Sequence, residues 1–158
     1  MIRELLIKIS QLKNCTLYPP KGLPIVEYDL PDDVKEFYEL CGGIDLFIDS
    51  DYSIKIVSPI EFEPANPVII GENIEGDRSS EWYIIAKDEN SQFITMDLNK
   101  NTHGRCYDSF HDRHGTVGNT DIIASSFTNF LTQLVNNESG YWYWLEDDFE
   151  YIGDAYEE

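Results

Sequence analysis

The stretch LPDDVKEFYELCGGIDLF, residues 30–47, decides the fold. Pro31 suits the first position of a helix, and the two acids that follow it favour the positive end of the helix dipole. The apolar residues after them recur at helical spacing: Val34, Phe37, Tyr38 and Cys41. The pair Gly42-Gly43 then supplies a left-handed stop, and residues 44–48 form a short apolar run. The stretch therefore predicts a helix, a tight turn and a strand in succession.

Helical patterns also occur near both ends of the chain. The first has one apolar face, formed by Ile2, Leu5, Leu6, Ile9 and Leu12. The last has another, formed by Ile123, Phe127, Phe130, Leu131 and Leu134. Ser125 or Ser126 is placed to cap the N-terminus of this last helix.

Strand patterns fill the region between these helices. Residues 54–56 alternate, and residues 82–86 and 93–96 flank the polar turn 87–91 in the manner of a hairpin. Residues 68–70 suggest one more short strand. A chain of 158 residues is one ordinary domain. We therefore predict a single α+β domain, with a central, mostly antiparallel sheet on which the N- and C-terminal helices pack.

Three segments together resemble the SUKH superfamily. Residues 30–47 are similar to its signature segment, residues 81–98 to its second block and residues 122–135 to its closing helix. The resemblance spans roughly residues 20–137. Six residues match the family pattern, and we expect each of them to serve the fold and not to contact a partner: Leu30, Pro31, Gly42, Gly43, Trp82 and Phe127.

Two features depart from the family pattern. Family members often carry glycine in the turn of the second block, where this chain has Glu89-Asn90-Ser91-Gln92. The C-terminal acidic and aromatic residues are not part of the shared pattern. We therefore expect a SUKH-like domain over residues 1–145 and a separate acidic, aromatic tail over residues 146–158.

The resemblance implies a class of function. The superfamily includes bacterial immunity proteins that neutralise polymorphic toxins, often nucleases or deaminases. It also includes fungal regulators of cell-wall synthesis that act as interaction scaffolds. Neither branch is known for catalysis, so the resemblance implies a non-catalytic protein-binding module without a cofactor. The regulatory scaffold remains the alternative to the immunity protein.

The charge of the chain fits an inhibitor of a basic protein. Thirty Asp and Glu stand against eleven Lys and Arg, a formal net charge of −19. Such a chain does not bind nucleic acid or an anionic membrane through its overall field. A basic toxin, most simply a nuclease, would attract it, and the acidic protein could occupy the nuclease cleft as a phosphate mimic. Direct binding and occlusion is the mechanism we expect.

The sequence also predicts where the protein acts. No apolar run approaches the roughly 18 residues of a membrane span, and the N-terminus lacks the pattern of a signal peptide. The cysteines Cys15, Cys41 and Cys106 are odd in number and widely spaced, unlike a disulfide framework. We expect a cytoplasmic protein with reduced thiols. The oligomeric state stays open.

The C-terminal aromatic run offers the candidate binding residues. Trp142 and Trp144 alternate with tyrosines, so a strand would place both indoles on one face as contacts for a partner. Equally, the run could pack back on the sheet. The acids that follow could line the contact with a basic partner or simply be solvated: Asp147, Asp148 and Glu150.

One cluster contains residue types that bind zinc. His103, Cys106, His111 and His114 have the spacing His-x2-Cys-x4-His-x2-His. The run is too compressed to offer four ligands easily, so we expect ordinary loop and core residues there and no metal. A metal-dependent enzyme that uses residues 103–114 is the remaining alternative, and we assign no catalytic residue.

Overall fold

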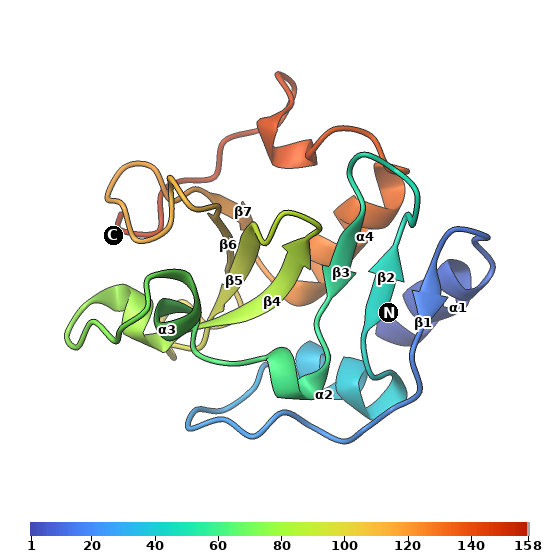
Figure 1. Ribbon diagram of the computed structural model, residues 1–158, viewed down its shortest axis with the longest axis horizontal. Coiled ribbons are helices and arrows are strands. Elements are labelled where there is room, and N and C mark those ends of the chain that lie inside the picture. Colours follow the sequence, from blue (N-terminus) through green and yellow to red (C-terminus); the bar gives the residue numbers. More distant parts are fainter. Residues whose placement is uncertain (158) are drawn as a thin grey trace.

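The computed structural model describes residues 1–157 and shows a seven-stranded antiparallel sheet with four α-helices (Figure 1). The helices are α1 (Ile2–Ser10), α2 (Asp32–Leu40), α3 (Ala65–Ile69) and α4 (Phe127–Asn136). The strands are β1 (Thr16–Leu17), β2 (Ile44–Leu46), β3 (Ile54–Ile56), β4 (Trp82–Asp88), β5 (Phe93–Asp97), β6 (Cys106–Ser109) and β7 (Ile122–Ala124). Short 3-10 helices are η1 (Pro59–Glu61), η2 (Arg78–Glu81) and η3 (Tyr143–Leu145). The predicted α+β class is confirmed.

The strands lie in the sheet in the order in which they occur in the chain. Each strand pairs antiparallel with the next, and a register shift interrupts the β4–β5 ladder between Ile84 and Ala86. Figure 1 shows α1, α2 and α4 behind the sheet and α3 in front of it. The main core therefore lies between the sheet and the three long helices.

Aromatic rings pack between α2 and α4. The Phe37 ring of α2 meets the Phe127 ring of α4 edge-on, with centroids 4.9 Å apart. Both rings are fully buried, and each such side chain contributes about 1.5–3 kcal/mol through burial. The Tyr38 hydroxyl donates to the Val57 carbonyl at 2.8 Å, which ties α2 to the chain just beyond β3.

The turn after α2 needs glycine at two positions for different reasons. Gly43 has φ +126°, a conformation that side chains rarely adopt. Gly42 lies so close to the preceding loop that a Cβ would stand 2.2 Å from the Pro19 carbonyl oxygen. The predicted left-handed stop is wrong in one respect, because α2 ends at Leu40 and its C-cap, Cys41, is extended. The positive φ occurs two residues later, at Gly43, and Gly42 is required by close backbone approach.

The predicted strand at residues 68–70 is wrong, because α3 covers most of this segment. Pro64 is the N-cap of α3 and Pro67 lies within its first turn. Backbone N–H groups there have no acceptor within the helix, so proline costs little. Apolar residues in so short a run do not distinguish a strand from a helix.

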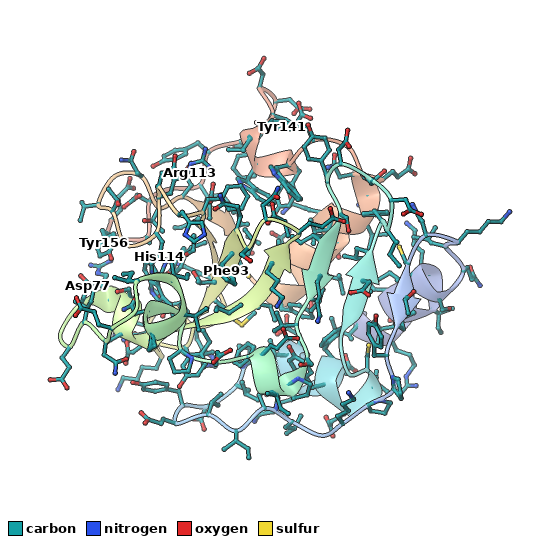
Figure 2. The ribbon with its side chains drawn as sticks, viewed as in Figure 1. Asp77, Phe93, Arg113, His114, Tyr141 and Tyr156 are labelled. Atoms are coloured by element: carbon teal, nitrogen blue, oxygen red, sulfur yellow. The ribbon has the colours of Figure 1, made fainter. Side chains whose placement is uncertain are left out.

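A hydrogen-bonded chain of side chains covers the front of β4–β6. His114 bonds to Asn66 at 2.6 Å, Asn66 to Ser79 at 2.9 Å, and Ser79 to Asp77 at 2.5 Å. The Tyr156 hydroxyl completes it by donating to Asp77 at 2.8 Å. Figure 2 shows Asp77, His114 and Tyr156 close together in front of the sheet. Beneath them lies Trp82, which is fully buried.

The C-terminal segment runs back along the edge of β7. Backbone bonds join Ile122 to Gly153 at 2.9 Å and Ala155 to Thr120 at 2.8 Å. The buried Asp154 carboxylate accepts from the backbone amides of residues 118, 120 and 156. The described part of the predicted tail, residues 146–157, therefore packs against the domain, while the boundary at residue 145 stays a prediction.

Candidate protein-binding site

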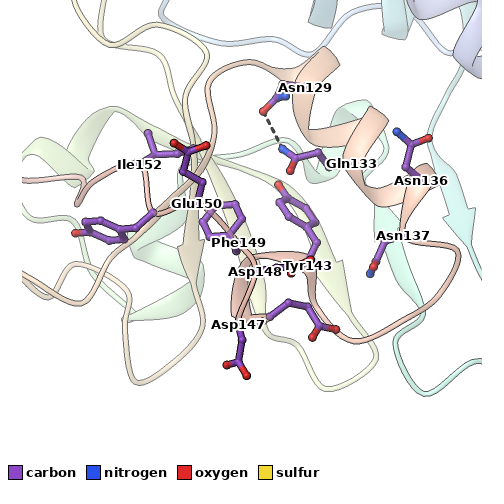
Figure 3. A pocket seen from close by; sticks show the side chains of 12 residues that line it. Asn129, Gln133, Asn136, Asn137, Tyr143, Asp147, Asp148, Phe149, Glu150 and Ile152 are labelled. Atoms are coloured by element: carbon purple, nitrogen blue, oxygen red, sulfur yellow. Dashed lines mark hydrogen bonds between the residues drawn. The ribbon is translucent and has the colours of Figure 1, made fainter.

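A groove of about 1080 Å³ separates α4 from the C-terminal segment (Figure 3). Amide side chains form one wall: Asn129, Gln133, Asn136 and Asn137. Acids form the other: Glu146, Asp147, Asp148 and Glu150. Tyr143, Phe149, Tyr151 and Ile152 complete the lining. The groove thus gathers the three acids that the sequence predicted as partner contacts.

The amide wall follows from the pattern of α4. The helix buries its apolar stripe against the core, which leaves Asn129, Gln133 and Asn136 on the opposite side at helical spacing. Ser126 caps the helix by accepting from the Asn129 amide at 3.1 Å. Gln133 donates to the Asn129 side chain at 2.9 Å, so the two amides hold one another in place.

The aromatic run that precedes the acid wall packs inward. Trp142 and Trp144 are only 9% and 4% exposed, and their indoles stack with centroids 5.5 Å apart. Residues 143–145 form η3, so the run is not the strand that would place both indoles on one outer face. Of the two interpretations left open, the structure shows the run packed on the domain. A contact between these indoles and a partner stays a prediction, and in this conformation they support the groove wall.

A buried aspartate anchors this run. The Asp108 carboxylate is fully buried and accepts from Trp144 Nε1 at 3.1 Å and from Arg113 Nη1 at 2.8 Å. The Phe110 amide also donates to it, at 3.1 Å. Burial raises the pKa of the Asp108 carboxyl, while these partners oppose the rise. Sequence reasoning did not identify Asp108. The one local feature that could have indicated it is that an acidic residue stands within the strand β6.

Nothing in the lining neutralises the acid wall. No Lys or Arg lines the groove, and the sequence contains none after Arg113. Within residues 1–157, every ion pair lies elsewhere in the fold. Asp147, Asp148 and Glu150 are exposed. Four carboxylates beside one another attract cations, and the guanidinium of arginine pairs with carboxylates in a bidentate geometry. The groove is therefore suited to a basic protein surface.

The four residues of zinc-binding type at positions 103–114 have separate surroundings. His103 bonds to the Asp29 carbonyl at 2.7 Å, while His111 packs against the Phe93 ring. Cys106 is fully buried, and burial raises the pKa of its thiol. His114 belongs to the series of hydrogen-bonded side chains that runs from His114 through Asn66 to Tyr156. In the part of the chain that the structure describes, no three His, Cys, Asp or Glu side chains gather as metal ligands.

The helices are short. None formed by residues 1–157 has both the length and the apolar character needed to cross a bilayer.

Comparison with known proteins gives two matches. The model of the SMI1 / KNR4 family (SUKH-1) matches residues 26–133. Immunity protein YokJ of Bacillus subtilis (strain 168) is 50% identical over 158 residues, which cover 99% of this chain and 96% of that protein. No solved structure matches significantly. The family match contains the helix, turn and strand of residues 30–47 and confirms the resemblance seen in the sequence: this chain belongs to the SMI1/KNR4 family.

Proposed function

We propose that this protein is a non-catalytic immunity protein that neutralises a polymorphic toxin by binding it directly. The observation that carries the proposal is the similarity to immunity protein YokJ, which extends over 99% of the chain. The similarity includes the C-terminal segment, which lies beyond the family match at residues 26–133. We place its action in the cytoplasm.

The toxin is proposed to be basic and of the nuclease type. A net charge of −19 favours encounter with a basic cleft, and the groove between α4 and residues 146–152 concentrates acids where a Lys- or Arg-rich surface would dock. Occupation of the cleft would exclude the polyanionic substrate. Such steering weakens with salt, because screening sets in at about 8 Å in physiological ionic strength.

The first experiment is capture of partners from a lysate of the source organism at low and at high salt. One basic polypeptide, retained at low salt and weakened at high salt, is the expected result. That polypeptide is then assayed for nuclease activity with and without the purified immunity protein. Inhibition that saturates at equimolar protein and is relieved by excess nucleic acid supports occlusion. Several unrelated partners and no inhibition would favour the regulatory scaffold instead.

The groove is tested with a charge-neutralised variant. Asp147→Asn, Asp148→Asn and Glu150→Gln together are expected to slow association with the captured toxin about tenfold at low salt. The matched control neutralises three exposed acids outside the lining of the groove: Glu72→Gln, Glu75→Gln and Glu89→Gln. Surface plasmon resonance at several salt concentrations separates the two. An equal decrease of the association rate in both variants would mean that the overall electrostatic field of the protein, and not the groove, directs binding.

A further inference from the structure

A second groove lies at the opposite end of the molecule from the acidic groove. It has a volume of about 620 Å³ and is lined by twelve residues: 21, 23–27, 59, 60, 62–64 and 83. Figure 1 shows the first segment as part of the long blue loop along the lower edge, whereas residues 140–150 lie at the top. The two grooves share no lining residue.

This second groove is apolar and unusually exposed. Ile25 and Ile60, one on each wall, are 99% and 89% exposed. Its floor is the stacked pair Phe62 and Tyr83, with ring centroids 5.5 Å apart and both rings buried. Single exposed apolar residues are ordinary, but two nearly bare isoleucines that line the same groove as an aromatic pair are typical of a contact site.

Charges around this groove indicate the chemistry of its occupant. Glu27 and Glu63 line it, and neither forms an ion pair within the described residues. Lys21 is the one cation in the lining. The complementary surface therefore has an apolar side chain with basic residues beside it. A second copy of this chain would bring another net charge of −19 and be repelled.

The wall formed by the loop also has free backbone groups. Residues 20–28 make no backbone-to-backbone hydrogen bond with the rest of the described chain. Pro20 and Pro24 have no N–H group, and the Glu27 backbone interacts with the Tyr83 hydroxyl. The other N–H and C=O groups of the loop remain available to an extended segment laid along it. An extended peptide can thus gain main-chain bonds from the wall and bury alternate side chains in the groove.

We propose that this apolar groove binds an extended segment of the same basic toxin. A branched or aromatic side chain sits between Ile25 and Ile60, and Lys or Arg residues face Glu27 and Glu63. The inference rests on the proposed function and adds that the toxin is held at two distant surfaces. Because distant sites act independently, changes in the two grooves add in binding free energy and therefore multiply in their effect on Kd.

The test uses the toxin captured by the wild-type protein. Its Kd is measured by isothermal titration calorimetry for the double variant Ile25→Ser, Ile60→Ser. The matched control is Val117→Ser with Ile7→Ser, at positions that are 72% and 54% exposed and lie outside both grooves. Both double variants change only exposed side chains, and thermal unfolding by circular dichroism verifies that each is folded.

We expect the groove variant to weaken binding about thirtyfold or more, with the salt dependence of the wild type, and the control to change it less than about twofold. When the substitutions of both grooves are combined in one protein, the fold-losses of affinity should multiply. A groove variant that binds within twofold of wild type overturns the inference and leaves the proposed function standing. A wild-type protein that binds no toxin overturns both.

Discussion

Mild acid should destabilise this protein through one buried histidine. The His114 side chain is 7% exposed and faces Trp82, with Asp77 and His111 as its charged or titratable neighbours. Since Asn66 donates its amide to Ser79, its carbonyl accepts from His114 Nε2–H. Desolvation by burial lowers the pKa of His114 from 6.5 to about 4, against the opposing attraction of Asp77.

The sign and size of the effect follow from linkage. The unfolded chain takes up a proton below pH 6.5, whereas the folded chain does so only near pH 4. Stability from neutral His114 is therefore complete above about pH 6.5 and is lost as the pH falls toward 4. The difference between these pKa values corresponds to about 3 kcal/mol in total, of which about 2 kcal/mol is gone by pH 5.

Urea denaturation at pH 7.5, 6 and 5 measures this loss. The comparison is with His114→Gln, which can still donate to Asn66 but does not titrate. Effects of the many carboxylates are nearly common to both proteins, so the difference between their unfolding free energies isolates His114. Wild type should lose about 2 kcal/mol more than the variant between pH 7.5 and 5. A difference that does not change with pH would refute the reasoning.

Two further substitutions test the fold that supports the grooves. Asp108→Ala leaves Trp144 Nε1 without its acceptor and Arg113 without its partner, and should cost about 3 kcal/mol of unfolding free energy in chemical denaturation. Asp108→Asn keeps an acceptor and should cost less; equal costs would contradict a role for these bonds. Gly42→Ala should cost about 2–4 kcal/mol, because its Cβ meets a backbone oxygen that cannot move freely. The control is Gly76→Ala, which adds a Cβ in open space and should cost only about 1 kcal/mol because of the positive φ at this position. Similar melting temperatures for the two glycine variants would argue against the close approach at Gly42.

Much of the fold could be predicted from local pattern. The stripes in residues 30–47 and near both termini correspond to α2, α1 and α4, and the hairpin pattern corresponds to β4 and β5. The apolar face expected for the C-terminal helix includes one residue that is not in that helix: Ile123 belongs to β7, and α4 begins only after its N-cap, Ser126. Periodicity identifies such elements because a buried face repeats along the chain.

The parts that escaped prediction depend on distant contacts. β1 has only two residues and is defined by its pairing with β2, so no local pattern indicates it. The inward packing of Trp144 depends on Asp108, which lies 36 residues earlier. The acids of the candidate site could be named from composition, but the groove exists only because α4 and residues 146–152 meet. The apolar groove likewise joins two loops that have no shared motif.

The strand order has a consequence for how the protein is made. Because every strand pairs with its predecessor in the chain, the sheet can grow one ladder at a time as the polypeptide leaves the ribosome. Its last edge is closed by residues 153–155, which follow β7 in the chain only after α4 and η3. Until then β7 has an open edge beside the nascent chain, a state exposed to wrong pairing. Pairing of residues 153–155 beside β7 is thus the step that completes the sheet and, with it, the acid wall of the groove.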